Sequence, residues 1–93
     1  MQFNIDASNA AQKSIEASQK VLEIQPENAL AYRNIGSAYA LKAVTDLHHE
    51  REKDMQSSKQ NALAAFQKAI ILNPRGEPLV IIVQYSLLKL DGL

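Results

Sequence analysis

The sequence predicts an all-α protein, and three observations lead to this fold class. Ala, Leu, Lys, Gln and Glu, which are good helix formers, are plentiful along the chain. Gly and Pro, which interrupt helices, occur only three times each. No run of alternating β-branched residues bounded by turn signals is present. With 93 residues, the chain has the length of one small domain.

The first predicted helix runs from about Ala7 to Ile24. Asp6 or Ser8 is its candidate N-cap, because a short polar side chain can accept a hydrogen bond from the first turn. Pro26 ends the helix, since proline lacks an N–H and disfavours helix at the preceding residue. One buried face is expected to contain the apolar and small residues Ala11, Ser14, Ile15, Ala17, Ser18, Val21, Leu22 and Ile24.

The second predicted helix begins after Asn28, a plausible N-cap. Gly36 lies in its middle, where Gly costs about 1 kcal/mol relative to Ala. A Gly at such a position indicates that another helix approaches closely. Steps of three or four place one set of residues on a shared face: Tyr32, Ile35, Tyr39, Ala43 and Leu47.

The third predicted helix ends at about Leu72, before the turn sequence 73–76. Its inward face is expected to hold Ala62, Phe66, Ala69 and Ile70, with Leu63 beside them. A fourth helix is predicted to begin near Glu77-Pro78 and to continue to residue 90, because proline suits the first helical position. It is apolar on nearly all sides, with Leu79, Val80, Ile81, Ile82, Val83, Leu87, Leu88 and Leu90.

Two segments together resemble the two helices of a tetratricopeptide (TPR) repeat. They are NALAYRNIGSAYA at 28–40 and NALAAFQKAIILNP at 61–74. The positions that carry the resemblance are Tyr32, Ile35, Gly36, Tyr39, Ala62, Phe66, Ala69 and Pro74. The resemblance implies antiparallel helical hairpins in a right-handed superhelical stack, about four helices here, and a role in holding partner proteins.

The repeat contains an insertion. Pro26 and Pro74 are 48 residues apart, whereas a TPR repeat has about 34 residues, so about 14 extra residues lie at about 43–60. Two interpretations remain open. Both helices can lengthen by about two turns, with a turn near 54–58, or a flexible loop can replace the tight turn. The apolar residues Ala43 and Leu47 favour the extended hairpin.

The resemblance divides the single domain of residues 1–93 into one complete repeat and two half repeats. Residues 1–27 are similar to the second helix of a preceding repeat, 28–76 form the complete repeat, and 77–93 are similar to a following first helix. TPR arrays usually need about three repeats for stability. The chain is therefore expected either to belong to a longer array or to complete its core with another copy.

The composition argues against several classes of function. Lys and Arg together balance Asp and Glu at 10 each, whereas a nucleic-acid binder usually carries a basic excess. The first residues, MQFNIDASNAAQK, show neither the basic start nor the apolar run of a secretory signal. The longest strongly apolar run, 79–83, is far shorter than the roughly 20 residues that span a bilayer. No cysteine occurs. The prediction is a cytoplasmic protein without nucleic-acid or membrane partners.

No motif predicts catalysis, a cofactor or a metal site. His48 and His49 are adjacent, so their side chains point about 100° apart, whereas a helical zinc pair needs histidines four residues apart. No catalytic triad pattern and no Gly-rich phosphate loop occurs. The chain is not expected to be an enzyme.

The TPR resemblance implies a protein or peptide partner on the first-helix face, with candidate contacts Arg33, Asn34, Ser37 and Leu41. Some TPR proteins bind the C-terminal carboxylate of a partner with a carboxylate clamp, which uses Lys or Arg and Asn on successive first helices. Such a clamp is not expected here, because the fourth predicted helix offers no cation before Lys89. The predicted function is a protein–protein interaction scaffold, as a segment of a larger protein. One alternative is a homodimer through the terminal helices, with candidate residues Leu79, Val83 and Leu87. Another is a regulatory TPR segment of a bacterial signalling enzyme such as a Ser/Thr kinase.

Overall fold

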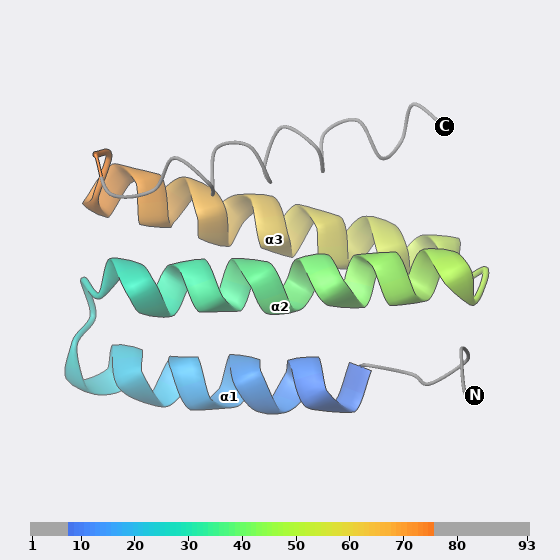
Figure 1. Ribbon diagram of the computed structural model, residues 1–93, viewed down its shortest axis with the longest axis horizontal. Coiled ribbons are helices and arrows are strands. Elements are labelled where there is room, and N and C mark those ends of the chain that lie inside the picture. Colours follow the sequence, from blue (N-terminus) through green and yellow to red (C-terminus); the bar gives the residue numbers. More distant parts are fainter. Residues whose placement is uncertain (1–7, 76–93) are drawn as a thin grey trace.

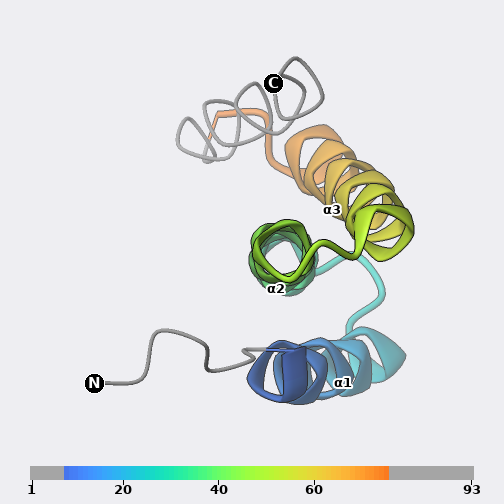
Figure 2. The same cartoon turned by 90° about the vertical axis from the view of Figure 1, so that its right-hand side faces the viewer.

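The computed structural model describes residues 8–75, which fold into three antiparallel α-helices (Figure 1). These are α1 (Ser8–Ile24), α2 (Ala29–His48) and α3 (Glu52–Leu72). The end-on view shows that α2 contacts both α1 and α3 (Figure 2). Within the described residues no strand occurs, so the predicted all-α class is confirmed there. The fourth predicted helix lies outside the described residues.

Helix α1 buries only a narrow stripe against α2. Ala11, Ile15 and Ser18 are buried at helical spacing. The prediction of a wider buried face was wrong, since Ser14, Ala17, Val21 and Ile24 are exposed. The reason is geometric: among the described helices α1 packs mainly against α2, and one such contact covers only one side of a helix. The candidate cap Asp6 lies outside the described residues, and Ser8 is the first helical residue.

Asn28 caps the N-terminus of α2, as predicted. Its backbone is extended, and its side-chain Oδ1 accepts a hydrogen bond from the Ala31 N–H at 2.9 Å. The same side chain donates through Nδ2 to Gln25 Oε1 at 2.6 Å. Asn28 therefore satisfies one of the otherwise unpaired first-turn donors and ties the helix to the preceding turn.

Residues at about 43–60, the predicted insertion, form part of a long helical hairpin rather than a flexible loop. Both α2 and α3 continue through the insertion, and they are joined by a short turn at His49–Arg51. The predicted turn near 54–58 was wrong, because those residues lie within α3. The turn occurs earlier because the Arg51 N–H donates to the Asp46 carbonyl at 2.8 Å, while Glu50 takes a left-handed backbone with φ of 57°.

At its C-terminal end α2 buries a residue that the periodicity did not select. Leu47 was predicted to lie on the buried face, yet it is 39% exposed. The neighbouring Asp46 is only 3% exposed. Asp46 and Leu47 come three and four positions after the buried Ala43, so they lie on either side of Ala43 around the helix axis. The packing of α3 covers Asp46 and leaves Leu47 exposed. The predicted face is otherwise buried at Ile35 and half-buried at the two tyrosines, Tyr32 and Tyr39.

The core consists of two clusters that meet at Tyr39. The α2–α3 cluster is centred on Phe66 and Ala62, and its half-buried neighbours are Tyr39, Ala40, Leu63 and Ile70. The α1–α2 cluster contains Ala11, Ile15 and Ala38, again with Tyr39 against it. Phe66 is 1% exposed, and its ring lies directly against Gly36. The inward face predicted for the third helix is confirmed, as is the close approach predicted at Gly36.

Candidate protein-interaction site

A shallow groove of about 270 Å³ lies between α1 and α2. We call it the α1–α2 groove, and it is lined by Ala10, Ala11, Ser14, Asn34, Ser37, Ala38 and Leu41. None of these side chains carries a charge. Small side chains on both helices leave the space, because Ala and Ser are too short to fill the volume between two neighbouring helices.

The groove brings together three of the four predicted partner contacts. Asn34, Ser37 and Leu41 all line it, since residues three or four apart share one face of α2. Arg33 is half-buried and does not line the groove. The α1 wall was missed from the sequence. The only feature of the sequence that marks this wall is a pair of small residues, Ala10 and Ser14, four positions apart. Such a pair can occur on any helix. Leu79, Val83 and Leu87 lie outside the described residues.

Further exposed apolar side chains lie along the two helices that form the groove. Leu41 is 46% exposed, and Leu30, on the same face three turns earlier, is 49% exposed. On α1, Val21 is 40% exposed and lies two turns beyond Ser14. Because α1 and α2 are antiparallel, Val21 and Leu30 both lie toward the connection that joins them (Figure 1). These exposed residues lie on the faces of α1 and α2 that also line the groove.

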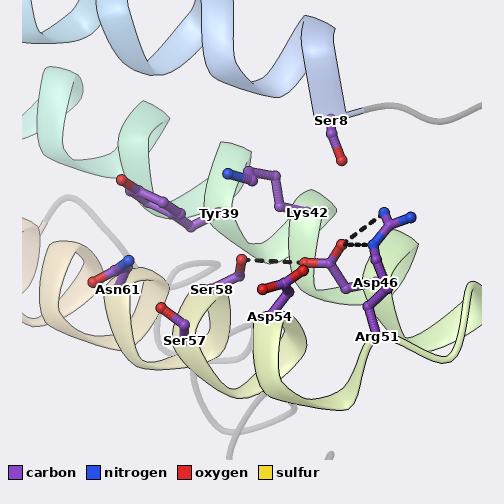
Figure 3. A pocket seen from close by; sticks show the side chains of 9 residues that line it. All are labelled: Ser8, Tyr39, Lys42, Asp46, Arg51, Asp54, Ser57, Ser58 and Asn61. Atoms are coloured by element: carbon purple, nitrogen blue, oxygen red, sulfur yellow. Dashed lines mark hydrogen bonds and ion pairs between the residues drawn. The ribbon is translucent and has the colours of Figure 1, made fainter.

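A second, polar hollow of about 390 Å³ lies near the turn between α2 and α3 (Figure 3). We call it the tip hollow. It is lined by Ser8, Tyr39, Lys42, Asp46, Arg51, Asp54, Ser57, Ser58 and Asn61. Its walls come from all three described helices and from the turn.

Asp46 organises the tip hollow. Its Oδ1 accepts from Arg51 Nε at 2.9 Å and lies 2.7 Å from the second guanidinium nitrogen Nη2. The Ser58 hydroxyl donates to Oδ2 at 3.4 Å (Figure 3). The Asp46 side chain is 5% exposed and that of Arg51 is 35% exposed. This pair therefore joins the end of α2, the turn and the first part of α3.

Several polar side chains of the tip hollow contact one another. In addition to the Asp46 contacts, Lys42 Nζ lies 5.6 Å from the centroid of the Tyr39 ring, within range of a cation–π interaction. Within residues 8–75 no buried side-chain nitrogen or oxygen lacks a hydrogen-bond partner. No orphaned group there calls for a ligand, so we assign these contacts a structural role in holding the turn.

No sequence pattern at about 43–60 predicted this arrangement. A buried aspartate gives no periodic signal, and its partners, five and twelve positions away, become visible only in the folded hairpin. The two histidines also take different positions: His48, the last residue of α2, is exposed, and His49 is half-buried.

The chain was compared with protein-family models, with curated proteins and with solved structures, and nothing matches it. None of the three described helices is both long enough and apolar enough to cross a membrane.

Proposed function

We propose that this chain is a protein–protein interaction module of the TPR type, with no chemistry of its own, and that the α1–α2 groove binds its partner. The observation that carries the proposal is the open, uncharged groove, in which Asn34, Ser37 and Leu41 meet a wall of small α1 residues. An open groove of uncharged side chains that includes the exposed Leu41 offers a surface that another polypeptide can cover.

The hairpin geometry also supports the proposal. In the TPR pattern a small residue lies where the second helix of a repeat packs on the first. Gly36 occupies this position, and the ring of Phe66 packs against it. Two long helices held in this way form a rigid platform. A rigid platform binds a peptide or helix without first losing its own conformational entropy.

The groove residues suggest how a partner would be recognised. Leu41 and Leu30 offer apolar contact area, whereas the Asn34 amide and the Ser37 hydroxyl can each donate and accept hydrogen bonds. A partner helix with one apolar face and a few uncharged polar groups fits this chemistry. Such binding follows the helix-in-groove mode, in which anchors at helical spacing enter an apolar groove.

The proposal is tested by site-specific photo-crosslinking in the cells that naturally produce the protein. A photo-reactive amino acid in place of Ser37 is expected to yield adducts with another polypeptide, and Leu41→Asp in the same chain is expected to remove them. Mass spectrometry of the adduct identifies the partner.

The matched control carries the same photo-reactive residue in place of Ser57, an exposed serine in the tip hollow. This position should give no adduct of the same mass. Absence of any adduct at position 37, or equal adducts at both positions, would contradict the proposed function.

A further inference from the structure

The α1–α2 groove is open at its surface and free of charge. The exposed fractions of Leu30 and Leu41 are close to one half, and the facing α1 wall is made of Ala and Ser. A second helix can approach such a wall closely, because small side chains bring two backbones together. The groove therefore suits an apolar helix without charged side chains on its contact face.

The chain itself contains a segment with this chemistry. Residues 77–90 read EPLVIIVQYSLLKL, with a single cation, Lys89, near the end and a single acid, Glu77, at the start. Leu79, Val83 and Leu87 are spaced by four, so they share one face of the helix predicted from the sequence. An uncharged apolar face of this kind can pack on the uncharged groove, whose lining is Ala and Ser on α1 and includes Leu41 on α2.

The described part of the chain ends next to α3, on a different side of α2 from the groove. The described residues end at Arg75, just after α3, and only Gly76 separates Arg75 from Glu77. One residue spans at most about 3.6 Å, whereas neighbouring helix axes are about 8–10 Å apart. The groove lies on the α1 side of α2, and α3 packs on another side (Figure 2). To reach the groove of its own chain, the segment that follows Arg75 would have to pass around α2, whereas the same segment of a second copy does not have this constraint.

We propose that residues 77–90 of a second copy of this chain occupy the α1–α2 groove, with Leu79, Val83 and Leu87 against Ser14, Ser37 and Leu41. This inference rests on the proposed function, since it names the partner of the same groove. Two copies that exchange these segments bury both grooves and close into a symmetric dimer.

Light scattering on the full chain over a concentration series is the first test. The expected mass is twice the 10.3 kDa of one chain. Ser37→Arg places a long charged side chain in the groove and should give a monomer with unchanged helical content by circular dichroism. Ser57→Arg, the same change at an exposed serine outside the groove, should remain a dimer.

A mixing experiment tests the pairing itself. Val83→Glu damages the segment but leaves the groove intact, so this variant should also be monomeric. An equimolar mixture of the Ser37→Arg and Val83→Glu variants retains one intact groove and one intact segment per pair, and it should recover a mass of two chains. Recovery would also demonstrate that both variants are folded.

Three results would overturn the inference: a monomeric wild-type chain, a dimeric Ser37→Arg variant, or a mixture that stays monomeric. A monomeric wild-type chain whose position 37 still crosslinks to a different polypeptide would leave the proposed function standing while removing the second copy as the partner. A self-adduct at position 37 that Val83→Glu abolishes would support both.

Discussion

Phe66 of α3 packs its ring against the backbone of Gly36 in α2, so closely that a Cβ at position 36 would lie 2.5 Å from the ring carbon Cδ1. Two further ring atoms would lie within 3 Å of it. The ring cannot turn into solvent, since Phe66 is 1% exposed. The missing side chain at Gly36 is therefore what lets α2 and α3 approach each other over the middle of the hairpin.

Gly36→Ala should lower the stability of the protein. Alanine gains about 1 kcal/mol of helix propensity over Gly, but overpacking a close contact costs about 1–3 kcal/mol. The expected net loss is about 1 kcal/mol, measured by chemical denaturation. Asn34→Ala, an exposed position in the same helix, is the control and should not lose stability. A stability gain for Gly36→Ala would contradict the contact.

Phe66→Ala should remove most of the α2–α3 core. Truncating a fully buried Phe typically costs about 3–5 kcal/mol, which is a large fraction of the stability of a small domain. Thermal unfolding should show a greatly lowered midpoint. Ile71→Ala, at a residue 62% exposed on the same helix, should change it little. A melting temperature for Phe66→Ala equal to that of the wild type would show that the ring is not in the core.

Breaking the Asp46–Arg51 pair should cost more when Arg51 is removed than when Asp46 is neutralised. Arg51→Met leaves the buried Asp46 carboxylate without its charged partner, at an expected cost of about 1–3 kcal/mol. Asp46→Asn leaves Arg51, whose side chain is 35% exposed and can be hydrated. Urea denaturation of both variants and of the double variant measures the difference. Equal losses for the two single variants would contradict this asymmetry.

Glu50→Gly should stabilise the turn. Glu50 has a φ of 57°, a left-handed conformation that costs an L-residue about 1 kcal/mol and that Gly adopts freely. The expected gain is up to about 1 kcal/mol, seen as a higher melting temperature. Glu52→Gly, in the first turn of α3, should lower it instead, because Gly is a poor helix former. A lower melting temperature for Glu50→Gly would mean that the turn is built differently.

Asn28→Ala should weaken the start of α2. Loss of an N-cap side chain typically costs about 1 kcal/mol, and here it also removes the contact with Gln25. Equilibrium unfolding should show this loss, and Asn28→Asp, which keeps the accepting oxygen, should recover most of it. If Asn28→Ala matched the wild type, the cap would contribute nothing.

Helix boundaries followed closely from the sequence. Asn28, Pro26 and the turn sequence after Leu72 are local signals, and each acts on the backbone within one helical turn. Gly36 and Phe66 were also predicted as core positions, because their spacing in the TPR-like pattern is regular. The outer part of the hairpin was harder to predict. The apolar periodicity selects Leu47, whereas the structure buries the adjacent Asp46.

The candidate site was predictable only in part. Asn34, Ser37 and Leu41 share one face of α2, and that follows from helical geometry alone. The α1 wall opposite them follows from how α1 packs, and no periodic signal marks it. The exposure of Val21 has the same cause, since it depends on which side of α1 receives a neighbour.

The sequence by itself determined the all-α class, the helix ends near Pro26, Asn28 and Leu72, and the core positions Gly36 and Phe66. Capping, proline geometry and 3.6-residue periodicity act over a few residues, so the order of residues is enough to predict them. The tertiary structure alone decided the position of the turn, the burial of Asp46 against Arg51 and Ser58, and the shape of the α1–α2 groove. Each of these depends on contacts between segments that come together only when the helices pack.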